Sequence, residues 1–288
     1  IENVLYNRTP LHHNAYYWQN AAVHAEMDAQ IIFPPTNYTM PYGGYRMIPW
    51  PIYNGVDVSW YKNTPEAFDY FCGIPGEYNG IYYHEKEEGT VHVGNKYELP
   101  GRKFFTWGTS DNSDIWIDIL TDSDGQYLEL QNGRLPTQGD VWKFGPYAVE
   151  RFVDYWYPVK NIGGFVKANQ YAAVNCEQQE DGILVGVNVT EKFTDLKLVL
   201  KGDGRELYQT EISRLSPDEY YRHLVQTPAK PDVPELILYD RDGNVLIHYK
   251  KTEVTTPIPE PKERVDVEEE MSAEELYLAG YHFEKRWQ

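Results

Sequence analysis

The sequence predicts a mainly β protein made of two consecutive sandwiches followed by one amphipathic helix. Three observations lead to this class. Short runs of β-branched and aromatic residues, broken by Gly, Pro and Asp-Gly turns, fill residues 1–164. Similar runs recur at intervals of about 8–12 residues over residues 165–256, which is the spacing expected of a small sandwich. A helical period appears only in residues 272–288.

Residues 1–164 are predicted to form a large antiparallel sandwich, because almost nothing in them has a helical period. The predicted strands include "IIFP" (31–34), "GIYYHE" (80–85), "GTVHVG" (89–94), "KFFTWG" (103–108), "IWIDILT" (115–121) and "QYLELQ" (126–131). The Asp-Gly pair in "TDSDGQ" (121–126) predicts a tight hairpin between the last two of these strands.

Residues 165–256 are predicted to form an immunoglobulin-like sandwich of about seven strands. The strands are "YAAVNCE", "GILVGVNVTE", "LKLVLKG", "RELYQTEI", "YYRHLV", "ELILYD" and "NVLIHYKK". Gly-containing turns at residues 201–204 and 240–243 separate two pairs of them.

The end of the chain is predicted to be a linker and a helix. Residues 257–271 are acidic and contain prolines, which is typical of a linker. Ser272 and Glu275 stand in capping-box positions at the start of the helix. Its apolar stripe consists of Leu276, Ala279, Gly280, Phe283 and Trp287. One helix cannot bury such a stripe alone, so we expect it to dock on another surface and to offer a route to a protein partner.

Composition and charge exclude several functional classes. The chain has 288 residues, 41% of them hydrophobic, which is enough for a sizeable core. A formal net charge of −18 disfavours nucleic acid and anionic membrane surfaces as partners. No apolar run is long enough for a transmembrane helix. Cys72 and Cys176 are expected as free core thiols, and no spacing typical of a metal or cofactor site is present. An extracytoplasmic location is favoured over a cytoplasmic one.

The segment "YLELQ" carries the clearest functional signal. The period of two in a strand places Leu128 and Leu130 on one face and Tyr127, Glu129 and Gln131 on the other. One face is therefore suited to a core. The other offers a carboxylate beside hydrogen-bonding and stacking groups, a mixture that suits hydroxyl-rich ligands.

Other candidate ligand contacts lie near this strand or on the strands before it. Arg134 and Gln138 follow within reach of the same hairpin. His84 and His92 stand on two successive predicted strands, and an imidazole can exchange a proton with a carboxylate partner. Trp107 is either a core residue or part of a stacking wall for a sugar ring, and a packed structural role is the alternative for both histidines.

Phrases spread along nearly the whole chain resemble a bacterial domain family of uncharacterised function. They include "LYNRTPLHHNAYYWQNAAVH", "DVSWYKN", "PGRKFFTWG", "LTDSDGQYLELQNGRLPTQ" and "MSAEELYLAGYHFEKRWQ". The resemblance implies a galactose-mutarotase-like β-supersandwich in residues 1–164, of which this chain holds the second half. It also implies that the last helix opens a tetratricopeptide-like region.

The same resemblance implies a carbohydrate-active protein. Glu129 as base with His84 as acid is the epimerase-like assignment, whereas a glycosidase needs a second carboxylate, for which Asp57 is the candidate. Hydrolysis of an oligosaccharide or glycan, with Glu129 as the acid/base residue in an aromatic-lined cleft, is the leading hypothesis. A non-catalytic glycan-binding module and a scaffold for a protein partner are the alternatives.

Overall fold

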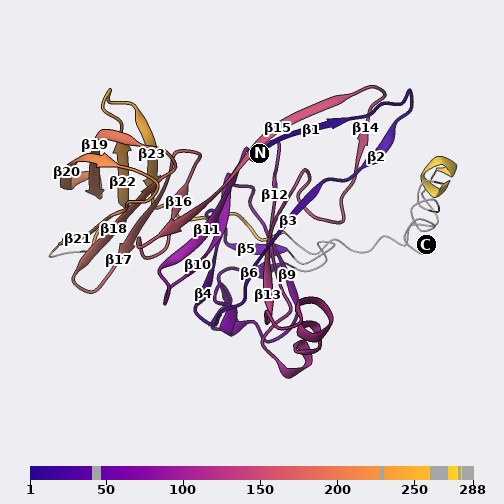
Figure 1. Ribbon diagram of the computed structural model, residues 1–288, viewed down its shortest axis with the longest axis horizontal. Coiled ribbons are helices and arrows are strands. Elements are labelled where there is room, and N and C mark those ends of the chain that lie inside the picture. The colour runs from indigo at the N-terminus through magenta and orange to yellow at the C-terminus, as the bar shows by residue number, and fades with distance from the viewer. Residues whose placement is uncertain (41–46, 228–229, 260–271, 278–279, 281–288) are drawn as a thin grey trace.

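A computed structural model describes residues 1–40, 47–227, 230–259, 272–277 and 280, and it confirms the mainly β class (Figure 1). All strand pairs are antiparallel. The N-terminal unit contains a five-stranded sheet of β1 (Glu2–Tyr6), β15 (Val149–Lys160), β11 (Glu88–Gly94), β10 (Tyr78–Tyr83) and β4 (Ala29–Ile32), in that order. Its six-stranded sheet has the order β3 (Trp18–His24), β13 (Tyr127–Gly133), β12 (Gly101–Thr106), β9 (Phe68–Cys72), β5 (Tyr38–Met40) and β6 (Ile48–Pro49).

Short elements complete this unit. β2 (His13–Ala15) pairs with β14 (Trp142–Phe144), and β7 (Ile52–Tyr53) pairs with β8 (Val56–Asp57). The helical turns are η2 (Tyr61–Asn63), η3 (Asp111–Ser113) and η4 (Ile117–Thr121).

The core of the N-terminal unit lies between its two sheets. Ile31 and Ile81 enter it from the five-stranded sheet, and Phe104, Leu128 and Leu130 enter it from the six-stranded sheet. Because side chains alternate along a strand, the residues between these apolar positions point to the outer faces of the sandwich.

The C-terminal unit is a second sandwich of two four-stranded sheets. One sheet has the order β16 (Lys167–Ala168), β17 (Ala172–Gln178), β18 (Gly182–Val189) and β21 (Tyr221–Gln226). The other has the order β20 (Arg205–Leu215), β19 (Phe193–Gly202), β22 (Pro234–Tyr239) and β23 (Val245–Lys250). The pairing of β18 with β21 and of β19 with β22 is that of an immunoglobulin-like sandwich, and its apolar cluster lies between the sheets.

The C-terminal unit packs on the outer face of the five-stranded sheet (Figure 1). Val91 and Val93 of β11 join Phe165, Ala168 and Ala173 in one buried cluster. Tyrosine hydroxyls add hydrogen bonds across the junction: Tyr78 donates to the carbonyl of Val166 at 2.6 Å, and Tyr157 donates to that of Asn169 at 2.8 Å. This contact covers one outer face of the N-terminal sandwich and leaves that of the six-stranded sheet for other contacts.

The segment 115–121 is helical, so the predicted strand there is wrong. Residues 115–116 are α-helical and continue into the π-helix η4. No hairpin follows, although Gly125 does adopt the positive φ of 78° that a turn glycine favours. The stacking of Trp116 on Trp107, with ring centroids 4.2 Å apart, explains the difference, because the chain must curl back to bring the two indoles together.

The start of the C-terminal helix agrees with its predicted cap. Residues 273–277 are helical, and the Oγ of Ser272 accepts a hydrogen bond from the backbone N–H of Glu275 at 3.3 Å. The carboxylate of Glu275 in turn accepts from the backbone N–H of Ser272 at 2.9 Å. Most of the predicted linker and stripe, including Ala279, Phe283 and Trp287, lies outside the described residues.

One end of the N-terminal core is polar and fully buried. His92 Nε2 lies 3.2 Å from Asp154 Oδ2, and its Nδ1 lies 3.1 Å from Asn79 Oδ1. Trp156 and Asn3 also donate to the Asp154 carboxylate, at 2.8 and 2.7 Å. Burial lowers the pKa of His92 to about 4, against the opposing effect of its hydrogen bond with Asp154.

We expect the free energy of unfolding to fall as the pH is lowered from about 6.5 to about 4. The unfolded chain protonates His92 near pH 6.5, whereas the folded protein does so only near pH 4, so acid favours unfolding across this window. The difference corresponds to at most about 3 kcal/mol. Burial raises the pKa of Asp154, but hydrogen bonds from His92 and Asn3 leave it lowered overall, which adds a loss in the same direction at lower pH.

Urea denaturation at pH 7 and pH 4.5 measures this effect, with His92→Gln as the comparison. The variant has no titrating group at this position, so its stability is expected to change less between the two pH values. Parallel profiles for the two proteins would show that His92 is not the origin of the acid sensitivity.

Candidate functional site

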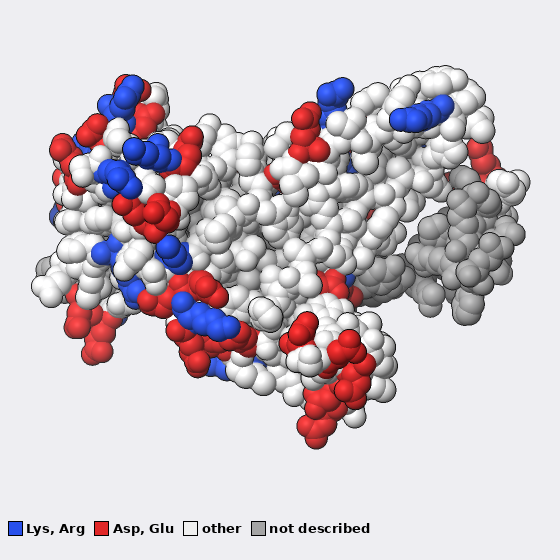
Figure 2. Space-filling view, in the orientation of Figure 1, with Lys and Arg blue, Asp and Glu red and all other residues white. Residues whose placement is uncertain are grey.

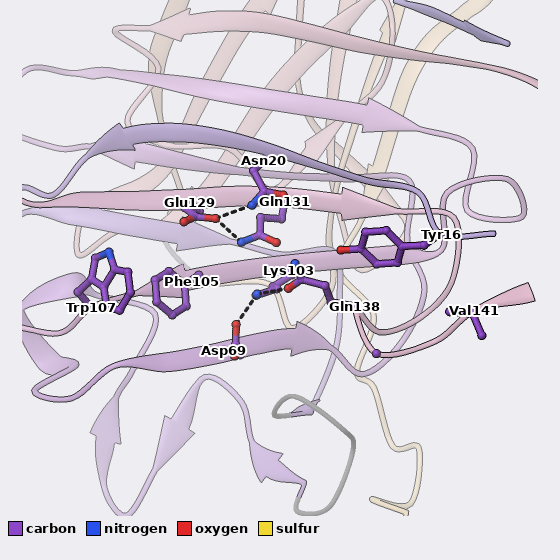
Figure 3. A pocket seen from close by; sticks show the side chains of 11 residues that line it. Tyr16, Asn20, Asp69, Lys103, Phe105, Trp107, Glu129, Gln131, Gln138 and Val141 are labelled. Atoms are coloured by element: carbon purple, nitrogen blue, oxygen red, sulfur yellow. Dashed lines mark hydrogen bonds and ion pairs between the residues drawn. The ribbon is translucent and has the colours of Figure 1, made fainter. Parts of the chain in front are cut away.

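A hollow of about 650 Å³ lies on the outer face of the six-stranded sheet (Figure 3). The residues that line it are Tyr16, Asn20, Asp69, Lys103, Phe105, Trp107, Glu129, Gln131, Gln138, Gly139 and Val141. Its floor comes from four neighbouring strands, β3, β13, β12 and β9, and its rim from the segments before β3 and after β13.

Strand register arranges the floor in two rows. One row carries Glu129, Phe105 and Asp69, which are directly opposite one another on β13, β12 and β9. The next carries Asn20, Gln131 and Lys103 on β3, β13 and β12. The apolar neighbours Leu128, Leu130 and Phe104 point into the core, so the alternation that buries them also presents the polar residues to the hollow.

The Glu129 carboxylate is held by two side-chain amides. Asn20 Nδ2 donates to Glu129 Oε2 at 2.8 Å, and Gln131 Nε2 donates to the same oxygen at 2.5 Å (Figure 3). Trp18 Nε1 donates to the amide oxygen of Gln131, which fixes the orientation of that amide. Glu129 therefore has a defined position without a cationic partner among its described contacts.

The only basic side chain among the described lining residues is Lys103, which is almost fully buried and already paired. Its Nζ forms an ion pair with Asp69 and donates to Gln138 Oε1 at 2.6 Å. It also lies over the rings of Phe71 and Phe105, 5.2 and 5.4 Å from their centroids. These contacts compensate for the loss of water around the ammonium group.

Aromatic rings form one end of the hollow. Phe105 and Trp107 meet edge to face with centroids 4.7 Å apart, and Trp116 stacks on Trp107. Ser113 Oγ donates to the carbonyl of Trp107 at 2.6 Å, which ties the β12–β13 connection to this end. Tyr127 is edge-on to Trp107 at 6.4 Å but is not among the lining residues.

The structure brings four of the predicted site residues into this hollow: Glu129, Gln131, Gln138 and Trp107. Sequence reasoning missed Asp69, Lys103, Asn20 and Phe105. Two of the missed residues had a signal in the sequence, because Asp69 in "FDYF" and Lys103 in "RKFF" are charged residues inside aromatic strands. Their pairing, however, depends on contacts between distant segments.

The two predicted histidines do not line the hollow. His84 follows β10 and lies in a separate cleft between the two units, where its Nε2 is 2.9 Å from Gln30 Oε1 and its ring is 4.7 Å from that of Trp60. Burial lowers its pKa below the ordinary value. His92 points into the core, because it alternates with Val91 and Val93 on the opposite face of β11. The structure therefore separates Glu129 from His84, which corrects the expectation that the two form an epimerase-like acid–base pair.

Asp57 and Arg134 also lie elsewhere. Asp57 Oδ1 accepts hydrogen bonds from the backbone N–H and the hydroxyl of Ser59, at 3.0 and 2.6 Å, so it organises a local turn. Arg134 forms an ion pair with Glu150 at 2.7 Å and donates to the carbonyl of Glu98, so it is not available to the hollow.

Other classes of site receive no support from the described residues. No group of three or more His, Cys, Asp or Glu in the described part of the chain is placed to hold a metal ion. Cys72 and Cys176 are free and buried, and burial raises the pKa of each thiol to about 12. Across the residues described, no helix is both long enough and apolar enough to span a membrane.

Two family models match the chain. The model described as a domain of unknown function, DUF5107, matches residues 1–159, and that of the second domain of YphG-like proteins matches residues 167–249.

Three solved structures are among those found to be similar to this chain. A TPR-domain-containing protein from Parabacteroides distasonis has 23% identity and a TM-score of 0.47, over 55% of this chain and 27% of that one. A protein assigned as an aldose 1-epimerase from Klebsiella pneumoniae has 12% identity and a TM-score of 0.37, over 55% and 41%. A β-glucuronidase from Ruminococcus gnavus has 12% identity and a TM-score of 0.20, over 85% and 47%. The chain thus spans less than half the length of each of these proteins.

Replacing Gly133 with alanine tests how the hollow is supported. An added Cβ would lie 1.6 Å from Cε3 of Trp18, so the indole that orients Gln131 must move. We expect Gly133→Ala to lower the free energy of unfolding by about 1–3 kcal/mol and to change the near-ultraviolet circular dichroism of the tryptophans. Gly145→Ala is the matched control, because its Cβ would have Ala148 at an ordinary 3.8 Å. Equal stability of the two variants would contradict this role of Gly133.

Proposed function

The chain belongs to the DUF5107 family, and we propose that its N-terminal unit binds a saccharide in the hollow above β3, β13, β12 and β9. One observation supports this most strongly: a carboxylate, an amide and an aromatic wall share a concave surface, and the carboxylate is positioned by other side chains before any ligand arrives. Such a surface offers hydrogen bonds to hydroxyl groups and flat rings to the apolar faces of a sugar.

The contacts of Glu129 favour binding as the primary role. Asn20 and Gln131 both present N–H donors to Oε2, so the carboxylate is held as a hydrogen-bond acceptor. The other carboxylate oxygen, Oε1, can accept hydrogen bonds from sugar hydroxyls. Gln131 and Gln138 add amide groups, which donate and accept, along the same wall.

Hydrolysis of the bound glycan is the second candidate. It is favoured by the position of Asp69, which stands on the same row as Glu129 with Phe105 between them. Strands about 4.8 Å apart put the two backbones about 10 Å apart. This separation is closer to the carboxyl separation of about 6.5–9.5 Å in inverting glycosidases than to that of about 5–5.5 Å in retaining ones. Asp69 is thus our candidate for the second carboxylate, the role for which the sequence had suggested Asp57.

We expect Glu129→Ala to weaken saccharide binding by about tenfold or more, because hydrogen bonds to a charged acceptor contribute about 1.5–3 kcal/mol. Thermal shift against a panel of mono- and oligosaccharides finds the ligand, and calorimetry measures its dissociation constant. A ligand at 100 times that constant adds about 2.7 kcal/mol of apparent stability. Glu88→Ala, on the other sheet and exposed, is the control. Unchanged affinity in Glu129→Ala would remove the hollow from the binding reaction.

For hydrolysis, we expect Glu129→Gln and Asp69→Asn each to abolish the release of reducing ends from the glycan that binds. The register described above predicts inversion at the anomeric carbon, which proton NMR of the first product detects. Binding without any product in the unmodified protein would leave a binding module, and retention of configuration would contradict the paired roles of these two carboxylates.

A further inference from the structure

We propose that the hollow selects saccharides that carry a free ammonium group, as in glucosamine units, over saccharides that carry carboxylate or sulfate groups. This selectivity rests on the saccharide binding proposed above and names the chemical class of ligand for the same site. It follows from the charges at the floor of the hollow and from those on a neighbouring protrusion.

The floor of the hollow carries one uncompensated negative charge. Lys103 is its only basic residue among those described, and its ammonium group is already shared between Asp69 and Gln138. Glu129 has no such partner. Both of its amide contacts reach Oε2, so Oε1 has no hydrogen-bond partner within the described residues. An ammonium group on a bound sugar would form an ion pair with Oε1 of this carboxylate, whereas an anionic substituent would be repelled by it.

A second source of negative charge lies at the aromatic end. The acidic lobe, residues 111–124 of the β12–β13 connection, contains five aspartates and no lysine or arginine. Those aspartates are Asp111, Asp114, Asp118, Asp122 and Asp124, and all are exposed. Figure 2 shows acidic side chains gathered on the protrusion that this connection forms below β13 in Figure 1.

The acidic lobe is joined directly to the hollow. Its Trp116 stacks on Trp107, which lines the hollow, and its Ser113 donates a hydrogen bond to the Trp107 carbonyl. A field from the lobe therefore acts at the entrance of the hollow and raises the local concentration of cations there. Because the lobe charges are exposed, salt screens them beyond about 8 Å at physiological ionic strength, whereas a contact with Glu129 is screened less.

The two sources of charge therefore predict two separable effects. Glu129 supplies a short-range preference that persists at moderate salt. The acidic lobe supplies a long-range preference that is present at low salt and disappears as salt is added. The net charge of the whole chain, −18, would also repel anions, but that effect does not depend on Glu129.

Calorimetry with three β-1,4-linked oligomers of equal length tests the proposal: glucosamine, glucose and glucuronate. We expect the glucosamine oligomer to bind up to about fivefold more tightly than the glucose oligomer, which is the upper range for one exposed ion pair, and the glucuronate oligomer to bind most weakly. At about 500 mM salt, where the acidic lobe is screened, Glu129→Gln is expected to weaken binding of the glucosamine and glucose oligomers and to bring the ratio of their dissociation constants close to one.

Two lobe variants separate the short-range effect from the long-range effect. The double variant Asp118→Asn, Asp122→Asn is expected to reduce the preference for glucosamine at about 20 mM salt and to leave it unchanged at about 500 mM. Ile119→Ser, which alters the same exposed lobe without changing charge, is the control.

Several results would overturn the proposal. Equal dissociation constants for the glucosamine and glucose oligomers would refute the selectivity while leaving saccharide binding intact. A preference that survives in Glu129→Gln at about 500 mM salt, where the acidic lobe is screened, would show that Glu129 is not its source. Absence of binding for all three oligomers and for the wider saccharide panel would overturn the proposed function together with this inference.

Discussion

The register of β13 between β3 and β12 is the constraint on which both the core and the hollow depend. Leu128 and Leu130 face the five-stranded sheet across the core, and Glu129 and Gln131 face the hollow. A slip of one residue would bury the carboxylate and expose both leucines, so the free energy of apolar burial holds the polar row in place. One strand pairing thus determines both the core and the proposed binding surface: the core face specifies the register, and the outer face presents the polar residues.

The C-terminal unit determines which outer face is open. It covers the five-stranded sheet, where Phe165 joins Val91 and Val93 of β11 in one buried cluster. Tyrosine hydroxyls donate to backbone carbonyls at this junction. His84 follows β10 of the five-stranded sheet and lies in the cleft between the two units, whereas Glu129 lies on β13 of the six-stranded sheet. The second sandwich therefore covers one outer face of the first sandwich and leaves open the face that carries the hollow.

The features of the fold and of the site that could be predicted from the sequence are those that local periodicity determines. Alternation in "YLELQ" was sufficient to place Glu129 opposite the core, and the turn glycines at 201–204 and 240–243 marked the C-terminal strands. Asp69 and Lys103 lie on the same surface as Glu129 only because β9, β12 and β13 pair across long stretches of chain. His92 takes the packed role that the sequence had left as the alternative, because a histidine on an otherwise apolar strand can point to either face. The helix at 117–121 was missed because its cause, the contact of Trp116 with Trp107, is tertiary.

The hydrogen-bond donors around Glu129 decide the order of the two candidate functions. A general acid must carry a proton. Oε2 of Glu129 already accepts from the N–H groups of Asn20 and Gln131, so a proton on this carboxyl group would have to lie on Oε1. The same donors suit a carboxylate that accepts a sugar hydroxyl or pairs with an ammonium group. If Asp69 serves as the acid in hydrolysis, its ion pair with Lys103 must open when the substrate binds. Binding needs no such rearrangement, so it is the function to which the resting geometry of the hollow corresponds most directly.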